Sequence, residues 1–258
     1  MFTPDKTITA ANYLEDYFNG TSAKALQEFY GNLPSLPEER RAELMLGMGY
    51  NFEYYDALFA LMMSNVLSSI SGVNYTPRYR AAQFMLQPFC SEYGIEAERP
   101  LAKTHRELYA DFYRRVTGRE MDELYPVENT NPWLAVSRYW SEHMKESLIC
   151  QGQDVNYRAT YNIGYHWAVE RLSLMEFIEM RKAWQKMGFQ APYLDAHCSV
   201  EEEHGDWALQ AVLAFTDVEN TTIKSGIQAH EEHLAGYYRE LNSLLKKNLR
   251  AETANSLN

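Results

Sequence analysis

Apolar side chains recur every three to four residues through most of the chain, the period of an α-helix that buries one face. Few segments alternate with a period of two, so we expect no β-sheet. The pattern, with its glycine and proline boundaries, predicts helices over residues 7–30 (broken near Asn19-Gly20), 37–70, 77–93, 100–118, 132–150, 157–187, 192–214 and 219–248. These elements predict an all-α bundle of about seven to eight helices, forming one domain over residues 1–258.

Composition narrows the range of partners. The net charge of -11 disfavours nucleic acid and anionic membranes, which attract clusters of Lys and Arg. The longest strongly apolar stretch, residues 57–63, is far shorter than the ~20 residues of a membrane helix. The N-terminus lacks the basic-then-apolar layout of a signal peptide, and three cysteines without a Cys-x-x-Cys pattern do not indicate disulfides. We therefore expect a cytoplasmic protein, and a homodimer as the commonest assembly.

The segment from Pro192 to His204 carries the clearest chemical pattern. His197, Glu201 and His204 stand at positions i, i+4 and i+7, so on a helix they share a strip about 60° wide. Imidazole nitrogen and carboxylate oxygen are ligands that suit iron, and manganese as well. The alternative is a solvent-exposed acidic face with two incidental histidines.

Three further ionisable residues fall on apolar helix faces. Glu170 shares a face with Ile163 and Leu174, where a carboxylate is costly unless it binds a metal or pairs with Arg or Lys of another helix. His105 is in line with apolar neighbours, although a hydrogen-bonded core histidine would look the same. Glu92 closes a predicted helix, and Glu98, in the loop before Pro100, is its competitor.

Together these segments resemble the haem-oxygenase-like di-metal oxidases, which bind no haem. The resemblance covers about residues 77–245 and rests on Glu92-Tyr-Gly, then His105-Arg-Glu-Leu-Tyr, an inward Glu170, and His197-x-x-x-Glu201-x-x-His204. It implies that Glu92, His105 and His197 hold one metal, that Glu201 and His204 hold the other, and that Glu170 bridges or lies near both. The sequence departs from the family pattern at Glu201, where Asp is usual, and in the thirteen positions from Glu92 to His105.

The resemblance further implies two Fe(II) ions per chain, with Mn possible, and dioxygen as co-substrate. It implies oxidation of a small molecule by C–C bond cleavage or N-oxygenation in a biosynthetic pathway. An amino acid or its derivative is the leading substrate class, and oxidative decarboxylation of a fatty acid is an alternative. The candidate substrate contacts are Tyr109, Tyr165, His166 and Arg171, with Arg138 and Arg158 as further carboxylate-binding candidates.

Two other readings remain open. A metal-free enzyme of the same fold, such as a thiaminase-like hydrolase or a cofactorless oxidase, would use Cys90, Cys150, Cys198 or acid–base residues. A non-catalytic helical binding protein would need every inward ionisable group to be a structural pair. The pair His230 and His233 also has metal-like spacing, but it lies on a polar segment, and we expect it at the surface.

Overall fold

The computed structural model describes residues 4–70, 75–95, 102–121 and 130–255. This part of the chain contains nine α-helices, one short 3-10 helix and no strand, which confirms the predicted all-α class. The elements are α1 (Pro4–Glu15), α2 (Thr21–Asn32), η1 (Leu33–Ser35), α3 (Glu38–Ser68), α4 (Tyr75–Glu92), α5 (His105–Thr117), α6 (Pro132–Ile149), α7 (Val155–Lys186), α8 (Pro192–Phe215) and α9 (Thr221–Asn255).

The predicted boundaries of α5 and α9 were wrong, and α9 runs to Asn255 rather than ending at residue 248. Helix α5 begins at His105 rather than near Pro100, which lies outside the described residues. The Thr104 side chain accepts the N–H of Glu107, and the Glu107 carboxylate accepts the N–H of Thr104. This reciprocal cap satisfies two of the free donors at the helix start, so it fixes His105 as the first helical residue.

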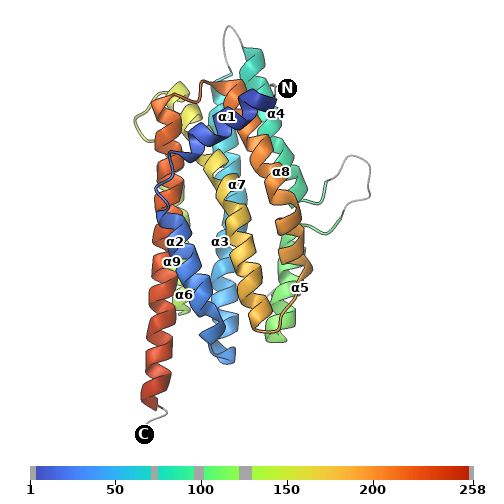
Figure 1. The fold of residues 1–258 in the computed structure, drawn as a ribbon, viewed down its shortest axis with the longest axis vertical. Helices are drawn as coiled ribbons and strands as arrows, with labels where there is room; N and C mark the ends of the chain where they lie inside the picture. The colour runs from blue at the N-terminus through green and yellow to red at the C-terminus, as the bar shows by residue number, and fades with distance from the viewer. Residues whose placement is uncertain (1–3, 71–74, 96–101, 122–129, 256–258) are drawn as a thin grey trace.

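The helices form an elongated bundle in which α7 runs along the centre (Figure 1). Helix α7 packs against α3, α8 and α9, and α4 and α5 both pack against α8. Side chains on every face of α7 are buried, as expected for a central helix. In the described part of the chain, no helix is long and apolar enough to cross a membrane.

Two glycines allow the close crossing of α7 and α9. A Cβ atom on Gly226 would collide with the backbone oxygen of Tyr161, and one on Gly164 with the backbone oxygen of Ile223. No other residue type fits there without moving a helix. The crossing therefore helps to set the position of α7, which carries Glu170.

The expectation that His230 and His233 are solvent-exposed was wrong. Their exposed fractions are 6% and 7%, and Glu231 between them is fully buried. Helix α9 packs against α2, α6 and α7, so most of its circumference is covered despite its polar sequence. His233 Nδ1 lies 3.0 Å from the hydroxyl of Tyr165, whereas His230 Nδ1 is buried without a hydrogen-bond partner among the described residues.

The core consists of two hydrophobic clusters. One includes Phe177 and Tyr193, and the other includes Phe59 and Tyr165. Members of both clusters line a single cavity together with Glu92 and other ionisable residues. The candidate site therefore lies where the two clusters meet, inside the bundle.

Candidate metal centre

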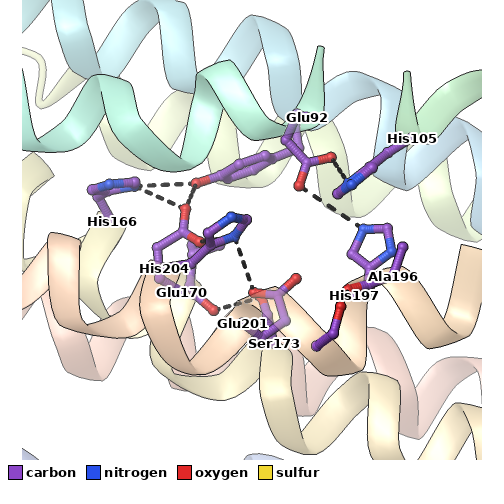
Figure 2. A network of polar contacts seen from close by, with 12 residues as sticks. Glu92, His105, His166, Glu170, Ser173, Ala196, His197, Glu201 and His204 are labelled. Carbon is purple, nitrogen blue, oxygen red and sulfur yellow. Dashed lines mark hydrogen bonds and ion pairs between the residues drawn. The ribbon is translucent and has the colours of Figure 1, made fainter. Parts of the chain in front are cut away.

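The six residues proposed as metal ligands come together in the structure. They are Glu92 at the end of α4, His105 at the start of α5, Glu170 on α7, and His197, Glu201 and His204 on α8. Figure 2 shows their side chains converging between these helices. Because four helices contribute, their packing holds the side chains in place.

Glu92, His105 and His197 form a first group. Each offers one ligand atom, and the three atoms lie within 4.8 Å of one another. The Nδ1 atom of His105 is 2.6 Å from Glu92 Oε2, and the Nε2 atom of His197 is 3.9 Å from Glu92 Oε1. The spacing leaves room for one cation between a carboxylate and two imidazoles.

The tautomer of His197 follows from its backbone contact. Its Nδ1 lies 2.9 Å from the carbonyl oxygen of Tyr193, one turn earlier on α8, and donates a hydrogen bond to it. Nε2 then carries the lone pair and faces Glu92. Burial lowers the pKa of His197 to about 4, so the imidazole is neutral at physiological pH and available as a ligand.

Glu92, Glu201 and His204 form a second group with the same spacing of ligand atoms. The Nδ1 atom of His204 is 3.6 Å from Glu201 Oε2 and 3.7 Å from Glu170 Oε2. The carboxylate common to both groups is thus Glu92, whereas Glu170 adjoins the second group through His204. The family resemblance implies that Glu170 bridges the two metals or lies near both, and in the structure its described contact with the ligands is to His204 of the second group.

The electrostatics of the site call for a cation. Burial and the nearby Glu201 carboxylate raise the pKa of Glu170 to about 8, and burial together with Glu92 raises the pKa of Glu201 well above 4.5. In the described residues no Lys or Arg pairs with either group, and Glu201 Oε2 is buried without a hydrogen-bond partner. A metal ion would supply a positive charge for both carboxylates and a partner for Glu201 Oε2, so these residues fit a metal ion.

Glu92 differs from the other two carboxylates. Burial acts to raise its pKa, but the contacts with His105 and His197 outweigh burial, and the pKa falls below 4.5. Glu92 is therefore ionised before any metal arrives. An ionised carboxylate placed between two groups of ligands is suited to bridge two metal ions.

Tyr55 on α3 is a site residue that the sequence did not reveal. Its hydroxyl donates to Glu170 Oε1 at 3.2 Å and lies 3.2 Å from His166 Nδ1. His166 is fully buried, and burial together with His204 lowers its pKa to about 3. Tyr55 and His166 therefore orient the Glu170 carboxylate, and only the spatial proximity of α3 and α7 identifies Tyr55.

A cavity of about 330 Å³ adjoins the ligands. Tyr109 and Tyr165, predicted as substrate contacts, line it. The Tyr109 hydroxyl donates to the backbone oxygen of Met45 at 2.6 Å. Most of the remaining wall is aromatic or aliphatic, including Phe52, Phe59 and Phe177. A small organic molecule could therefore lie beside the metal ligands and away from bulk water.

The remaining sequence candidates lie elsewhere. Arg171 pairs with Glu15 of α1, and none of Arg171, Arg138 and Arg158 lines the cavity, so they are not placed to grip a substrate there. Glu98 lies outside the described residues. The three cysteines are free thiols, and none lines the cavity.

Comparisons with known proteins identify the family and the fold of the chain. A family model described as iron-containing redox enzyme matches residues 50–238, a span that contains all six candidate ligands. A crystal structure of a CADD-like protein of unknown function from Nostoc punctiforme PCC 73102 is similar in fold, with a TM-score of 0.63 and 14% identity over 92% of this chain and 97% of that one. No curated protein matches the chain significantly. The chain has the haem-oxygenase-like helical fold and belongs to the family of iron-containing redox enzymes.

Proposed function

We propose that this protein is a non-haem di-iron enzyme that uses dioxygen to oxidise a small organic molecule. Its chemistry would be C–C bond cleavage or N-oxygenation, with an amino acid or an amino-acid derivative as the substrate. The observation that carries the proposal is that two groups of three ligands share the Glu92 carboxylate. A shared carboxylate is suited to keep two metal ions close together.

The ligand set supports iron in particular. Three imidazoles and three carboxylates give mixed nitrogen and oxygen ligation, which suits iron and leaves positions for other ligands. Iron bound there would supply electrons for the reduction of dioxygen. The protein itself would hold the ligands, keep His197 in one tautomer through Tyr193, and orient Glu170 through Tyr55.

The cavity supports a role for the chain in positioning a substrate. Its aromatic wall, with Phe59 and Phe177, would exclude water from the reacting molecule. Val169 and Ser173 also line the cavity, one residue before and three residues after Glu170. A bound molecule would therefore lie next to the metal ligands, as oxidation of that molecule requires.

The proposal can be tested by loading the metal-free protein with Fe(II) under anaerobic conditions. We expect two iron ions per chain, and consumption of dioxygen with a change in the visible spectrum on exposure to air. His197→Ala and His204→Ala should each lower the iron content and the rate of oxygen consumption. His143→Ala, which removes an exposed histidine of α6, is the matched control and should retain both.

Other outcomes would favour the alternatives. A protein that binds no iron but converts a substrate would support the metal-free enzyme. A protein that binds no iron and consumes no oxygen with any amino acid or fatty acid would support a binding protein. Full oxygen consumption by His197→Ala and His204→Ala would contradict the proposed ligand set.

A further inference from the structure

The charged residues that line the cavity are almost all acidic. The described lining contains one Arg or Lys, Arg106, against six carboxyl groups: Glu53, Asp56, Glu92, Glu170, Glu176 and Glu201. Arg106 forms an ion pair with Glu53, so it is already neutralised. Whether the cavity favours a cation therefore depends on which of these carboxyl groups keeps a negative charge that no metal ion or Arg balances.

Most of the acidic residues have a partner or an assigned role. Glu92, Glu170 and Glu201 would be compensated by metal ions, and Glu176 accepts a hydrogen bond from the hydroxyl of Tyr238. Asp56 differs, because none of the ion pairs formed by the described residues includes it. Its carboxylate accepts one hydrogen bond, from the Tyr93 hydroxyl at 2.8 Å. Asp56 therefore remains a half-buried negative charge beside the metal centre.

Aromatic side chains stand next to this charge. Phe59 lies one turn after Asp56 on α3, and its ring stacks on that of Phe89 with centroids 4.2 Å apart. The ring of Phe89 in turn contacts that of Tyr93, with centroids 4.9 Å apart. All four residues line the cavity, and Tyr93 is 40% exposed. A carboxylate combined with aromatic rings is an arrangement that binds ammonium groups.

We propose that Asp56 binds the ammonium group of an amine substrate in the cavity, with Phe59, Phe89 and Tyr93 beside it. This inference rests on the proposed function, because the amine would be the substrate of the same metal centre. The sequence suggested that arginine residues bind a carboxylate of the substrate, whereas here a negatively charged residue binds its ammonium group. Asp56 would determine specificity by favouring amines over carboxylic acids of the same length.

The test compares n-hexylamine, hexanol and hexanoate, which share a six-carbon chain and differ in charge. Their binding to the anaerobic Fe(II)-loaded protein would be measured by calorimetry, without any turnover. We expect the amine to bind at least about tenfold more tightly than hexanol, and hexanoate most weakly. Trimethylhexylammonium, which cannot donate a lone pair to iron, should also bind more tightly than hexanol.

Variants test whether Asp56 supplies the negative charge that binds the amine. Asp56→Asn should reduce amine affinity about tenfold, to near that of hexanol. Asp206→Asn, a matched change at an exposed position of α8, should leave amine affinity unchanged. Tyr93→Phe removes the hydroxyl but keeps the Asp56 charge and the ring, so it should retain the preference for the amine.

Equal amine affinity in wild type and Asp56→Asn would overturn the inference, as would tighter binding of hexanoate by the wild type. Even if the Asp56→Asn variant does not fold, a wild type that binds the amine no more tightly than hexanol would overturn the inference. Because iron content and oxygen consumption are measured separately, failure of the proposed function would appear there, whereas failure of this inference would appear in the affinities.

Discussion

The carboxylate of Glu231, on α9, accepts the backbone N–H of Thr21 at 3.0 Å, across 210 positions of the sequence. The same carboxylate accepts the N–H of Asn19 at 2.7 Å. Helix α2 begins after Gly20, which has no side chain to cap the helix. Glu231 therefore caps the start of α2 from another helix, a role that the side chain of an Asp or Ser at the N-cap position usually fills. Its negative charge also suits the positive end of the α2 dipole.

We expect Glu231→Ala to destabilise the protein by about 2–3 kcal/mol, because the part-buried Asn19 N–H and the buried Ser22 hydroxyl lose their acceptor, while the Thr21 N–H keeps only the Asn19 side-chain oxygen. Glu231→Gln should cost less, about 1–2 kcal/mol, because the amide oxygen can still accept one of these bonds. Denaturant unfolding of the metal-free protein measures both. The control is Glu232→Gln at the neighbouring exposed position, and equal stabilities for Glu231→Ala and this control would contradict the role of the cap.

Local periodicity was enough to predict part of the site. His197, Glu201 and His204 lie on one helix, so their spacing alone placed them on a common strip, and the structure turns that strip inward. Glu170 was recognisable because a carboxylate among apolar neighbours on one helix face must be buried. Most helix boundaries followed from proline, glycine and capping residues. The exceptions include the start of α5, where the cap at Thr104 was not recognised, and the end of α9, which continues to Asn255.

The rest of the site depends on contacts between helices, which have no local signal. In the sequence Tyr55 has no feature that separates it from the other tyrosines. Only the packing of α3 against α7 brings its hydroxyl to Glu170. The sharing of Glu92 between two groups depends on how the end of α4 meets α8. The polar pattern of α9 suggested exposure, yet Glu231 is buried because its partners are backbone groups of a distant helix.

The two ligand groups should be separable by mutation. His197 belongs only to the first group and His204 only to the second, whereas Glu92 belongs to both. We therefore expect His197→Ala and His204→Ala each to retain about one iron, and Glu92→Ala to weaken both sites. Elemental analysis after anaerobic dialysis against limiting Fe(II) measures the stoichiometry. Loss of both ions from His204→Ala alone, with the fold intact by circular dichroism, would show that the sites are not separable in this way.

Metal binding should release protons and strengthen with rising pH. The pKa of Glu170 in the metal-free site is about 8, so this carboxyl group holds a proton at pH 7, and burial also raises the pKa of Glu201. A metal ion must displace this proton, so affinity should increase from about pH 6 to pH 8. Titration calorimetry with Mn(II), which is stable in air, in buffers of different ionisation enthalpy would count the released protons. An affinity independent of pH, with no proton release, would contradict the described electrostatics.

Glu176 should make the metal-free protein less stable at higher pH. Burial raises its pKa to about 7, whereas the unfolded chain has the ordinary value near 4.5. Between these values the unfolded state loses the proton first, so the stability of the folded state falls as pH rises from about 4.5 to 7. The loss should reach about 3 kcal/mol relative to Glu176→Gln, which cannot ionise. Unfolding of both proteins across this range measures the difference, and Glu203→Gln, at an exposed position of α8, should show no such trend.

The close crossing of α7 and α9 gives a prediction that links packing to the metal centre. Alanine is the better helix former by about 1 kcal/mol, so on propensity alone Gly226→Ala would stabilise α9. The added Cβ, however, would meet the backbone of Tyr161, which cannot rotate away as a side chain can. We expect a net loss of about 2–3 kcal/mol, since overpacking against a helix backbone forces the two helices apart.

Tyr161 and Glu170 lie on the same helix, α7. A displacement of α7 by the Gly226→Ala side chain should therefore also move the Glu170 carboxylate relative to His204 and weaken metal binding. Gly31→Ala provides the matched control, because nothing lies within 4 Å of its added Cβ at an exposed position of α2. That variant should be more stable by about 0.5–1 kcal/mol and should bind Mn(II) like the wild type. If Gly226→Ala were as stable as Gly31→Ala, the two helices would have room that the structure does not show, and the crossing would not determine the position of Glu170.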